Sequence, residues 1–406
     1  MNLWRKAYRE NWQLWIEPHS RRTIILKIIK IDNLPPICLI ILICSQFFPG
    51  IDLTHHLETT RMYNEMMVEG RFLLKNPYLL AGQQSTITYG IPFYTIGGIL
   101  WFLFGRFTID LLMCLTTVFS FFVIRRITCN AGYQTMALIS IWGFIIPNSY
   151  IAYCANFFLW LTAYLYLKGK RYYQIPLAIA CFTHPFSIVV GLYYAYKERK
   201  NILLIGIFLF YYLIITFIFT SQGSMVLPNA INTLVARVAI GLFPILLHED
   251  FSKKIIRIAS ISLVALVSIS NVVLFLLVEP MQIRGFYEGY QTLFEDFPNI
   301  SGNMRVVDYD YLPSAYYFHK RGLAVNTGSF FESWIHQTRR KWEGAKEYQQ
   351  HMERHLIDYV LTCKKCGAIF PGVHPTEKAI LSSRYPLIWE NQYYNLYRTY
   401  ISGEMP

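Results

Sequence analysis

Long apolar runs separated by short polar connections constrain this 406-residue chain more than any other feature. Counted singly, the runs predict about nine membrane spans, although several are shorter than the roughly 20 residues that a bilayer-crossing helix needs. The short runs are therefore candidates for half-helices or re-entrant segments. The runs lie at approximately 34–48, 91–104, 108–124, 135–151, 157–167, 175–196, 202–219, 226–247 and 255–278.

The composition agrees with a membrane protein. Hydrophobic residues make up 54% of the chain and charged residues 15%, whereas water-soluble chains carry roughly 25% charged residues. Aromatic residues make up 17%, and their rings favour the membrane interface. These values exclude a cytosolic enzyme, a disordered scaffold and a small secreted module.

The net charge of +12 is unevenly distributed. Residues 280–406 hold 14 Lys and Arg against 13 Asp and Glu, so the basic excess flanks the apolar runs. This pattern fits the positive-inside bias and anionic lipid head groups rather than nucleic acid. It predicts a cytoplasmic N-terminus, and an odd number of spans places the tail outside. In strict alternation, however, Arg125-Arg126 and residues 168–171 fall on the external side, which conflicts with the rule.

The sequence divides into three parts. Residues 1–33 form a basic segment, cytoplasmic or interfacial. Residues 34–279 form a polytopic α-helical body in the plasma membrane, interrupted by a polar external loop at 50–89. Residues 280–406 are expected to form an extracytoplasmic α/β domain.

The pattern of the tail supports that last expectation. A helix-like stretch at 342–356 lies between candidate strands at 305–308 and 359–362, and a hairpin-like pair follows at 387–389 and 394–397. About 127 residues suffice for an independent domain.

The first candidate for chemistry follows the first span. Asp52, His55 and His56 stand at i, i+3 and i+4, so on a helix they share one face. At the membrane surface, a carboxylate and imidazoles can reach both a lipid head group and a polar acceptor. The alternative is that Asp52 caps a helix and is followed by solvated histidines. The two interpretations are compatible.

Around this loop the sequence resembles the GT-C superfamily of integral-membrane glycosyltransferases, in a poorly characterised prokaryotic branch. Asp52 matches the aspartate of the family's first external loop, Glu69-Gly70 the end of an amphipathic helix, and Gly90-Ile-Pro-Phe-Tyr94 the entry into the second span. Residues 388–397 resemble the closing strand pair of an external domain that follows the spans in many members.

The resemblance implies an inverting transfer of a sugar from a polyprenyl-phosphate donor to a hydroxyl of a glycan, lipid or protein acceptor at the external membrane face. Asp52 is the expected general base, with His55 and His56 beside it. The leaving lipid phosphate needs cationic stabilisation. Arg237 is the first candidate because a charge inside an apolar run is expensive, and its alternative role is snorkelling to the interface. Arg61 and Arg71 are further phosphate candidates, or solvated.

The remaining candidates are less determined. His184, followed by Pro185, either binds substrate or satisfies carbonyls freed by the proline. Glu58 is a further substrate-binding candidate and, with Asp52, a candidate ligand of a divalent cation (Mg or Mn). Many GT-C members carry a second acid beside the loop aspartate, but here a leucine follows Asp52. A metal-dependent mechanism and a metal-free one with Asp52 as base therefore both stay open.

A hypothesis from another class competes with catalysis. A non-catalytic membrane protein that binds or translocates a lipid-linked sugar, or a subunit of a cell-envelope glycan assembly, would share the same composition. It would present a groove that no carboxylate faces. In the tail, Cys363 and Cys366 form a lone Cys-Lys-Lys-Cys, which favours a local disulfide or two free thiols over a metal site.

Overall fold

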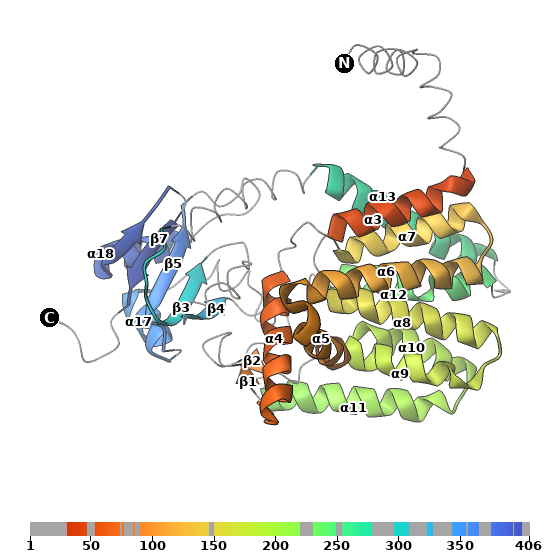
Figure 1. The fold of residues 1–406 in the computed structure, drawn as a ribbon, viewed down its shortest axis with the longest axis horizontal. Helices are drawn as coiled ribbons and strands as arrows, with labels where there is room; N and C mark the ends of the chain where they lie inside the picture. The colour runs from red at the N-terminus through yellow and green to blue at the C-terminus, as the bar shows by residue number, and fades with distance from the viewer. Residues whose placement is uncertain are drawn as a thin grey trace, which may run out of the picture.

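The computed structural model of the chain is mostly helical, with a small sheet toward the C-terminus (Figure 1). Asp52 and Cys366 lie outside the described residues, and so does most of residues 283–297, whose pattern in the sequence predicts a helix. The structure describes residues 31–46, 53–73, 75–76, 84–85, 90–145, 150–219, 230–248, 254–277, 296–307, 323–327, 343–354, 356–364, 375–392 and 394–399.

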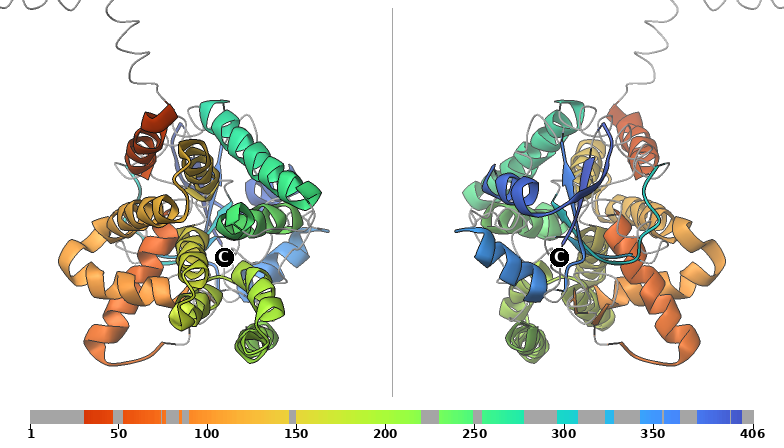
Figure 2. Two further views of the ribbon diagram at one scale, coloured as in Figure 1. Left: turned by 90° about the vertical axis from the view of Figure 1, so that its right-hand side faces the viewer. Right: turned by 90° about the vertical axis from the view of Figure 1, so that its left-hand side faces the viewer.

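Most of the helices run side by side in one bundle (Figure 1). In the views of Figures 1 and 2, α3, α7 and α13 lie along the top of the bundle and α11 along the bottom. The bundle helices are α3 (Leu34–Gln46), α6 (Thr108–Ile127), α7 (Ala131–Ile145), α8 (Tyr150–Leu167), α9 (Gln174–Thr183), α10 (Phe186–Lys197), α11 (Asn201–Phe219), α12 (Ala230–His248) and α13 (Lys254–Leu277).

Contacts between the helices define their directions. The hydroxyls of Thr117 in α6 and Tyr153 in α8 lie 2.7 Å apart, and α7 connects the two helices through short links, so α6 and α8 run in the same direction. A ring nitrogen of His248, the last residue of α12, contacts the carbonyl of Ile127, the last residue of α6. The C-terminal ends of these helices therefore meet at one end of the bundle.

The helices α9 and α10 form a hairpin that returns to the end of the bundle from which it starts. The short helix η4 (Arg171–Tyr173) leads into α9. Its Tyr173 ring lies 5.8 Å from the Tyr194 ring near the end of α10. The side-chain amide of Asn201, the first residue of α11, donates to the Tyr173 hydroxyl at 2.8 Å and to the Tyr194 carbonyl at 2.9 Å. Both ends of the hairpin are thus fastened together.

The turn of this hairpin lies at His184-Pro185. Proline lacks an N–H and disfavours helical geometry in the residue before it, and His184 is accordingly extended at φ −150° and ψ 136°. The expectation of one continuous span over residues 175–196 is therefore wrong for this segment. The segment instead forms two helices, α9 and α10, joined at this turn.

The helix α4 (Leu53–Glu69) lies across the ends of the bundle helices (Figure 1). It packs on α5 (Ile91–Phe104), which continues through η3 (Gly105–Phe107) into α6. Glycines allow this close approach: a Cβ on Gly97 would lie 2.8 Å from Cγ2 of Thr60. The amide of Asn64 donates to the Gly98 carbonyl at 2.9 Å. Two short strands, β1 (Lys75–Asn76) and β2 (Gln84–Ser85), pair between α4 and α5.

Basic connections gather at the other end of the bundle. One pocket is lined by Asp32, Arg125 and Gln134, so the start of α3, the end of α6 and the start of α7 meet there. Because α8 runs with α6 and the α9–α10 hairpin turns back, the connections after α6, α8 and α10 also lie at this end. Their basic side chains are Arg125, Arg126, Lys168, Lys170, Arg171, Lys197, Arg199 and Lys200, and α13 begins with Lys254.

The basic clusters at 125–126 and 168–171, which strict alternation of spans would place with the external connections, lie at the same end of the bundle as residues 197–200. Two expected spans do not connect opposite ends of the bundle: α5 packs on α4 at one end, and α9–α10 returns to the other. Toward the α4 end, the described residues include the basic side chains Arg71 and Arg106. Basic side chains are therefore more numerous at the end where α6, α8 and α10 finish, without being confined to it.

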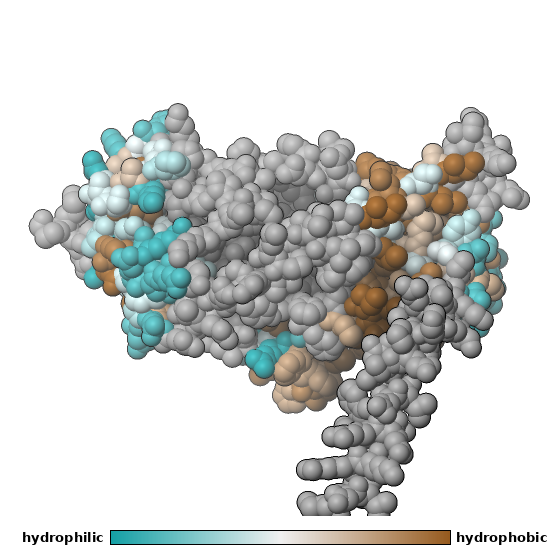
Figure 3. Space-filling model, turned by 90° about the horizontal axis from the view of Figure 1, so that it is seen from above, coloured by the Kyte–Doolittle hydropathy of each residue, from teal (hydrophilic) through white to brown (hydrophobic). Residues whose placement is uncertain are grey.

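Large apolar side chains are exposed on the outer helices. Leu203 and Phe210 of α11 are 74% and 66% exposed, and Phe102 of α5 is 79% exposed. Figure 3 shows apolar side chains over the bundle and hydrophilic ones over the C-terminal part. Among the described residues, one helical stretch, Ile91–Ile127, is long and apolar enough to cross a membrane, while the other apolar helices are shorter.

The C-terminal part contains a five-stranded sheet in the order β4-β3-β5-β7-β6. The strands β4, β3 and β5 pair in parallel. The strand β7 pairs antiparallel with both β5 and β6. The hairpin expected in the last part of the sequence is confirmed by the β6–β7 pairing. The strands are β3 (Gly302–Val307), β4 (Leu323–Thr327), β5 (Tyr359–Cys363), β6 (Leu387–Glu390) and β7 (Tyr394–Arg398).

Two helices pack beside this sheet, α17 (Ala345–Arg354) and α18 (Pro375–Arg384). A buried polar cluster joins them to β3: the Arg305 Nε lies 3.3 Å from Glu377 Oε1, to which the Tyr348 hydroxyl donates at 2.9 Å. Burial and the neighbouring Glu377 carboxylate raise the pKa of Tyr348 well above its ordinary value, so its hydroxyl stays protonated as a donor.

Candidate functional site

The segment expected to carry chemistry begins at α4. Asp52 lies outside the described residues, directly before Leu53, the first residue of α4. The backbone of His55 lies in the first turn of that helix. Asp52 immediately precedes this helix in the sequence, so its two interpretations, as a cap of the helix and as a general base, both stay predictions.

His56 is buried between α4 and α5. Its side chain is 2% exposed, and its Nδ1 lies 2.8 Å from the Tyr94 hydroxyl. The ring packs edge-on against Phe93 with 6.1 Å between centroids. Gly90, at φ +80°, precedes these aromatics, and a Cβ there would lie 2.7 Å from Cδ1 of Ile151. The Gly-Ile-Pro-Phe-Tyr motif thus supplies the surface against which His56 packs.

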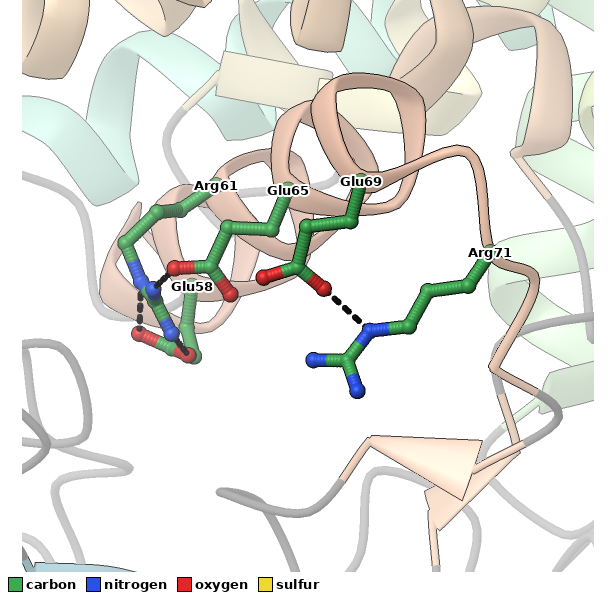
Figure 4. Close-up of polar contacts among 5 residues, drawn as sticks. All are labelled: Glu58, Arg61, Glu65, Glu69 and Arg71. Carbon is green, nitrogen blue, oxygen red and sulfur yellow. Dashed lines mark hydrogen bonds and ion pairs between the residues drawn. The ribbon is translucent and has the colours of Figure 1, made fainter.

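Glu58 and Arg61 form an ion pair within α4 (Figure 4). Arg61 Nη2 donates to Glu58 Oε1 at 2.6 Å, and its Nε donates to Oε2 at 3.2 Å. The remaining guanidinium nitrogen, Nη1, bonds Glu65. Glu58 is fully buried, and this burial raises the pKa of its carboxyl although Arg61 lowers it. The structure brings these two predicted residues together as partners of each other.

Arg71 lies at the far end of α4. Its side chain is 62% exposed and pairs with Glu69, which is 43% exposed (Figure 4). An exposed pair of this kind contributes little to stability. The position leaves Arg71 accessible at the α4 end of the molecule, and its predicted contact with a phosphate stays a prediction.

His184 and Arg237 meet inside the bundle, although 53 residues separate them. Arg237 Nη1 lies 3.4 Å from His184 Nε2 at the turn of the α9–α10 hairpin. Arg237 is seven residues from Ala230, the first residue of α12, which is about 10 Å along the helix. The pair therefore lies below the α4 end of the bundle rather than at its surface.

This pair has the chemistry of an anion site. A neutral imidazole has one acceptor nitrogen, and His184 Nδ1 already faces the Phe186 N–H at 3.3 Å. Its Nε2 faces a guanidinium, which only donates. An anion that reached both groups would accept from Nε2–H and from Arg237 together, and the predicted contact of Arg237 with the lipid phosphate stays a prediction.

The carbonyls freed at the hairpin turn have another partner. The Tyr212 hydroxyl of α11 lies 2.9 Å from the Cys181 carbonyl and 3.4 Å from that of Phe182. The sequence interpretation assigned this role to His184 as an alternative and did not single out Tyr212. In a tyrosine-rich chain, no local pattern distinguishes this tyrosine from its neighbours.

Aromatic side chains connect α4 with the hairpin turn. Burial raises the pKa of Tyr63 in α4, and Tyr211 of α11 is close enough to raise it further electrostatically. The Tyr211 ring packs at 5.1 Å from the ring of Phe182, two residues before His184. The two regions predicted separately therefore belong to one contiguous end of the bundle.

The described residues do not form a metal site. Within that part of the chain, no group of three or more His, Cys, Asp or Glu side chains could hold a metal ion. Both carboxylate oxygens of Glu58 accept from Arg61, and a divalent cation held by Asp52 and Glu58 stays a prediction.

No known protein family, curated protein or solved structure matches the chain.

Proposed function

We propose that the chain is an integral-membrane glycosyltransferase that moves a sugar from a polyprenyl-phosphate donor to an acceptor hydroxyl at the external membrane face. In this proposal Asp52 is the general base and the transfer inverts the sugar's configuration. The proposal extends the resemblance of the 50–94 region to GT-C enzymes.

The observation that carries the proposal is the uneven distribution of basic side chains along the bundle. Basic side chains gather at the end where α6, α8 and α10 finish, whereas α4 lies across the opposite end. The positive-inside rule assigns the basic end to the cytoplasm. Asp52, directly before α4, then stands at the external surface, where a lipid-linked sugar would be used.

The exposed apolar side chains support membrane placement. A soluble monomer rarely exposes contiguous apolar patches larger than a few hundred Å². Here large apolar residues are exposed on consecutive turns of α11, including Ile207, Phe210 and Leu213. Acyl chains are the surroundings that such helices require.

In this proposal, proton removal and phosphate stabilisation are carried out by different groups. A carboxylate at Asp52 can take the proton of the acceptor hydroxyl as that oxygen attacks the anomeric carbon. The bond to the lipid phosphate breaks at the same time, and charge builds up on the leaving phosphate. Arg237 and the Nε2–H of His184 would stabilise that charge from inside the bundle.

A transfer assay tests the proposal. Membranes containing the full chain are supplied with a panel of radiolabelled polyprenyl-phosphate sugars, and labelled acceptor is measured. Asp52→Asn is expected to lower transfer by about 10²-fold or more, since a positioned base contributes roughly 10²–10⁴ in rate. Val68→Ala, an exposed change in the same helix, is the control and should retain activity.

Full transfer by Asp52→Asn would overturn the catalytic assignment. Donor binding by the wild-type chain without any transfer would favour the rival function, a carrier or binding subunit for a lipid-linked sugar.

A further inference from the structure

A pocket of about 440 Å³ opens at the basic end of the bundle, opposite α4. Its volume lies within the roughly 300–1,000 Å³ that small-ligand pockets occupy. It lies between the start of α3, the end of α6 and the start of α7, and none of its residues takes part in the proposed transfer. The lining residues are Asp32, Pro36, Phe121, Arg125, Cys129, Ala131 and Gln134.

Two opposite charges line this pocket. Asp32 comes from η1 (Ile31–Asn33), directly before α3, and Arg125 from the last turn of α6. Both are exposed, and in the described part of the chain no ion pair joins the two side chains. The Arg125 guanidinium stays near its own helix, 6.0 Å from the Phe121 ring. The pocket therefore presents both an anion and a cation.

Apart from Gln134, the rest of the wall is largely apolar, and it continues into exposed apolar surface. Pro36, Phe121 and Ala131 line the pocket itself. Along α6, Phe122 is 54% exposed, and along α3, Ile40 is 61% exposed. Both helices extend from the pocket toward the middle of the bundle, so a molecule with a charged head here could lay an apolar tail beside them.

We propose that this pocket binds the head group of a zwitterionic phospholipid of the phosphatidylethanolamine type. The planar guanidinium of Arg125 suits the phosphate, and the Asp32 carboxylate accepts hydrogen bonds from the ammonium. The acyl chains lie along α3 and α6. A purely anionic head group would offer the Asp32 carboxylate no cation and would repel it. A quaternary ammonium group is a cation but has no N–H to donate to that carboxylate. This inference rests on the proposed membrane placement and not on the transfer chemistry.

Cys129 provides the readout, because it is exposed and lines the pocket. The full-length chain in detergent is treated with a thiol-reactive maleimide, and labelling of each cysteine is followed by peptide mass spectrometry. Micelles are doped with phosphatidylethanolamine, phosphatidylcholine or phosphatidylglycerol. Phosphatidylethanolamine is expected to slow labelling of Cys129 several-fold and more than the other two lipids. Cys44, exposed near the opposite end of α3, should label at a constant rate.

Neighbouring arginines supply the matched variants. Arg125→Ala should abolish protection, whereas Arg126→Ala, an exposed change outside the pocket, should retain it. Asp32→Asn should remove the preference for phosphatidylethanolamine over phosphatidylglycerol. An unchanged Cys44 rate in each variant reports an intact fold.

Equal protection by all three lipids, no protection by any, or equal loss in both arginine variants would overturn the lipid site. Failure of the chain to sediment with membranes would instead contradict the membrane placement, and with it the basis of the proposed function.

Discussion

The ion pair of Glu58 and Arg61 gives the most quantitative prediction. Glu58 is 0% exposed and Arg61 13% exposed, and Arg61 contacts both carboxylate oxygens. Arg61→Ala therefore leaves a buried carboxylate without its cation, a change that costs about 3–5 kcal/mol. We expect the lower end because Arg61 keeps some solvent contact. At 2–4 °C per kcal/mol, a loss of ~3 kcal/mol lowers the melting temperature by ~6–12 °C.

Scanning fluorimetry of the full chain in detergent measures this shift, and two variants serve as controls. Glu65→Ala removes only the exposed arm of the network, at 38% exposure, and should cost at most about 1 kcal/mol. The double variant Glu58→Leu with Arg61→Met should recover most of the loss, since replacing a whole buried pair by apolar residues is often neutral. A shift in Arg61→Ala no larger than in Glu65→Ala would refute the reasoning.

The loss of stability in Arg61→Ala should depend on pH, and the direction of this dependence follows from the pKa of Glu58. Burial raises the pKa of Glu58 above its ordinary value of 4.5, so the folded state holds this proton more tightly than the unfolded chain. Its contribution to stability is complete below pH 4.5 and is lost as the pH rises through the raised pKa. Removal of Arg61 raises the pKa further. The difference in melting temperature between Arg61→Ala and wild type should therefore shrink toward pH 4.5 and grow toward pH 8.

Two further pairs of variants test the packing of the bundle and the proposed role of Arg237 in stabilising the leaving phosphate. Asn156 is 1% exposed, and within the described part of the chain neither atom of its side-chain amide has a hydrogen-bond partner. Replacing this buried unsatisfied amide in Asn156→Leu should therefore stabilise the protein by about 1–3 kcal/mol. The expected result is a melting temperature several degrees higher. Asn201→Leu should lower it by a similar amount, because that amide bonds three partners, and the opposite ranking would contradict the helical packing. Arg237→Met should reduce sugar transfer by about 10²–10³-fold, the usual effect of removing one donor from a transition-state charge. Arg106→Met, an exposed change on the same side of the bundle, should not, and equal activity of the two variants would remove Arg237 from the mechanism.

Local patterns predicted several helices of the body well, since apolar runs coincide closely with α3, α6, α11, α12 and α13. The boundary between α7 and α8 was predicted wrongly, because α7 ends at Ile145 and α8 begins at Tyr150, whereas the expected runs were 135–151 and 157–167. The paths of α5 and of residues 174–197 did not follow from hydropathy. Each of these segments is as apolar as a membrane-spanning helix, so hydropathy does not distinguish it from the other helices. Its path is set by tertiary contacts instead. Gly97 and Gly98 let α5 pack against α4, while Asn201 fastens the two ends of the hairpin.

The candidate site was predictable in its residues but not in their partners. A charge in an apolar run and a His-Pro pair singled out Arg237 and His184, but their contact depends on a hairpin that brings distant segments together. Glu58 and Arg61, three residues apart, could be read as neighbours on a helix. Their burial, which turns a surface pair into a buried one, comes from the packing of α4 and is not visible in the spacing.

The proposed function requires that the two ends of the bundle face opposite sides of a membrane. Chemical labelling from one side of the membrane tests this arrangement most directly. Intact cells expressing a Glu69→Cys variant are treated with a membrane-impermeant maleimide, and each cysteine is quantified by peptide mass spectrometry. We expect labelling of the cysteine at position 69, at the α4 end, while Cys129, at the basic end, reacts only after the membrane is opened. Labelling of Cys129 in intact cells with protection of position 69 would contradict the orientation and the placement of Asp52 at the external surface.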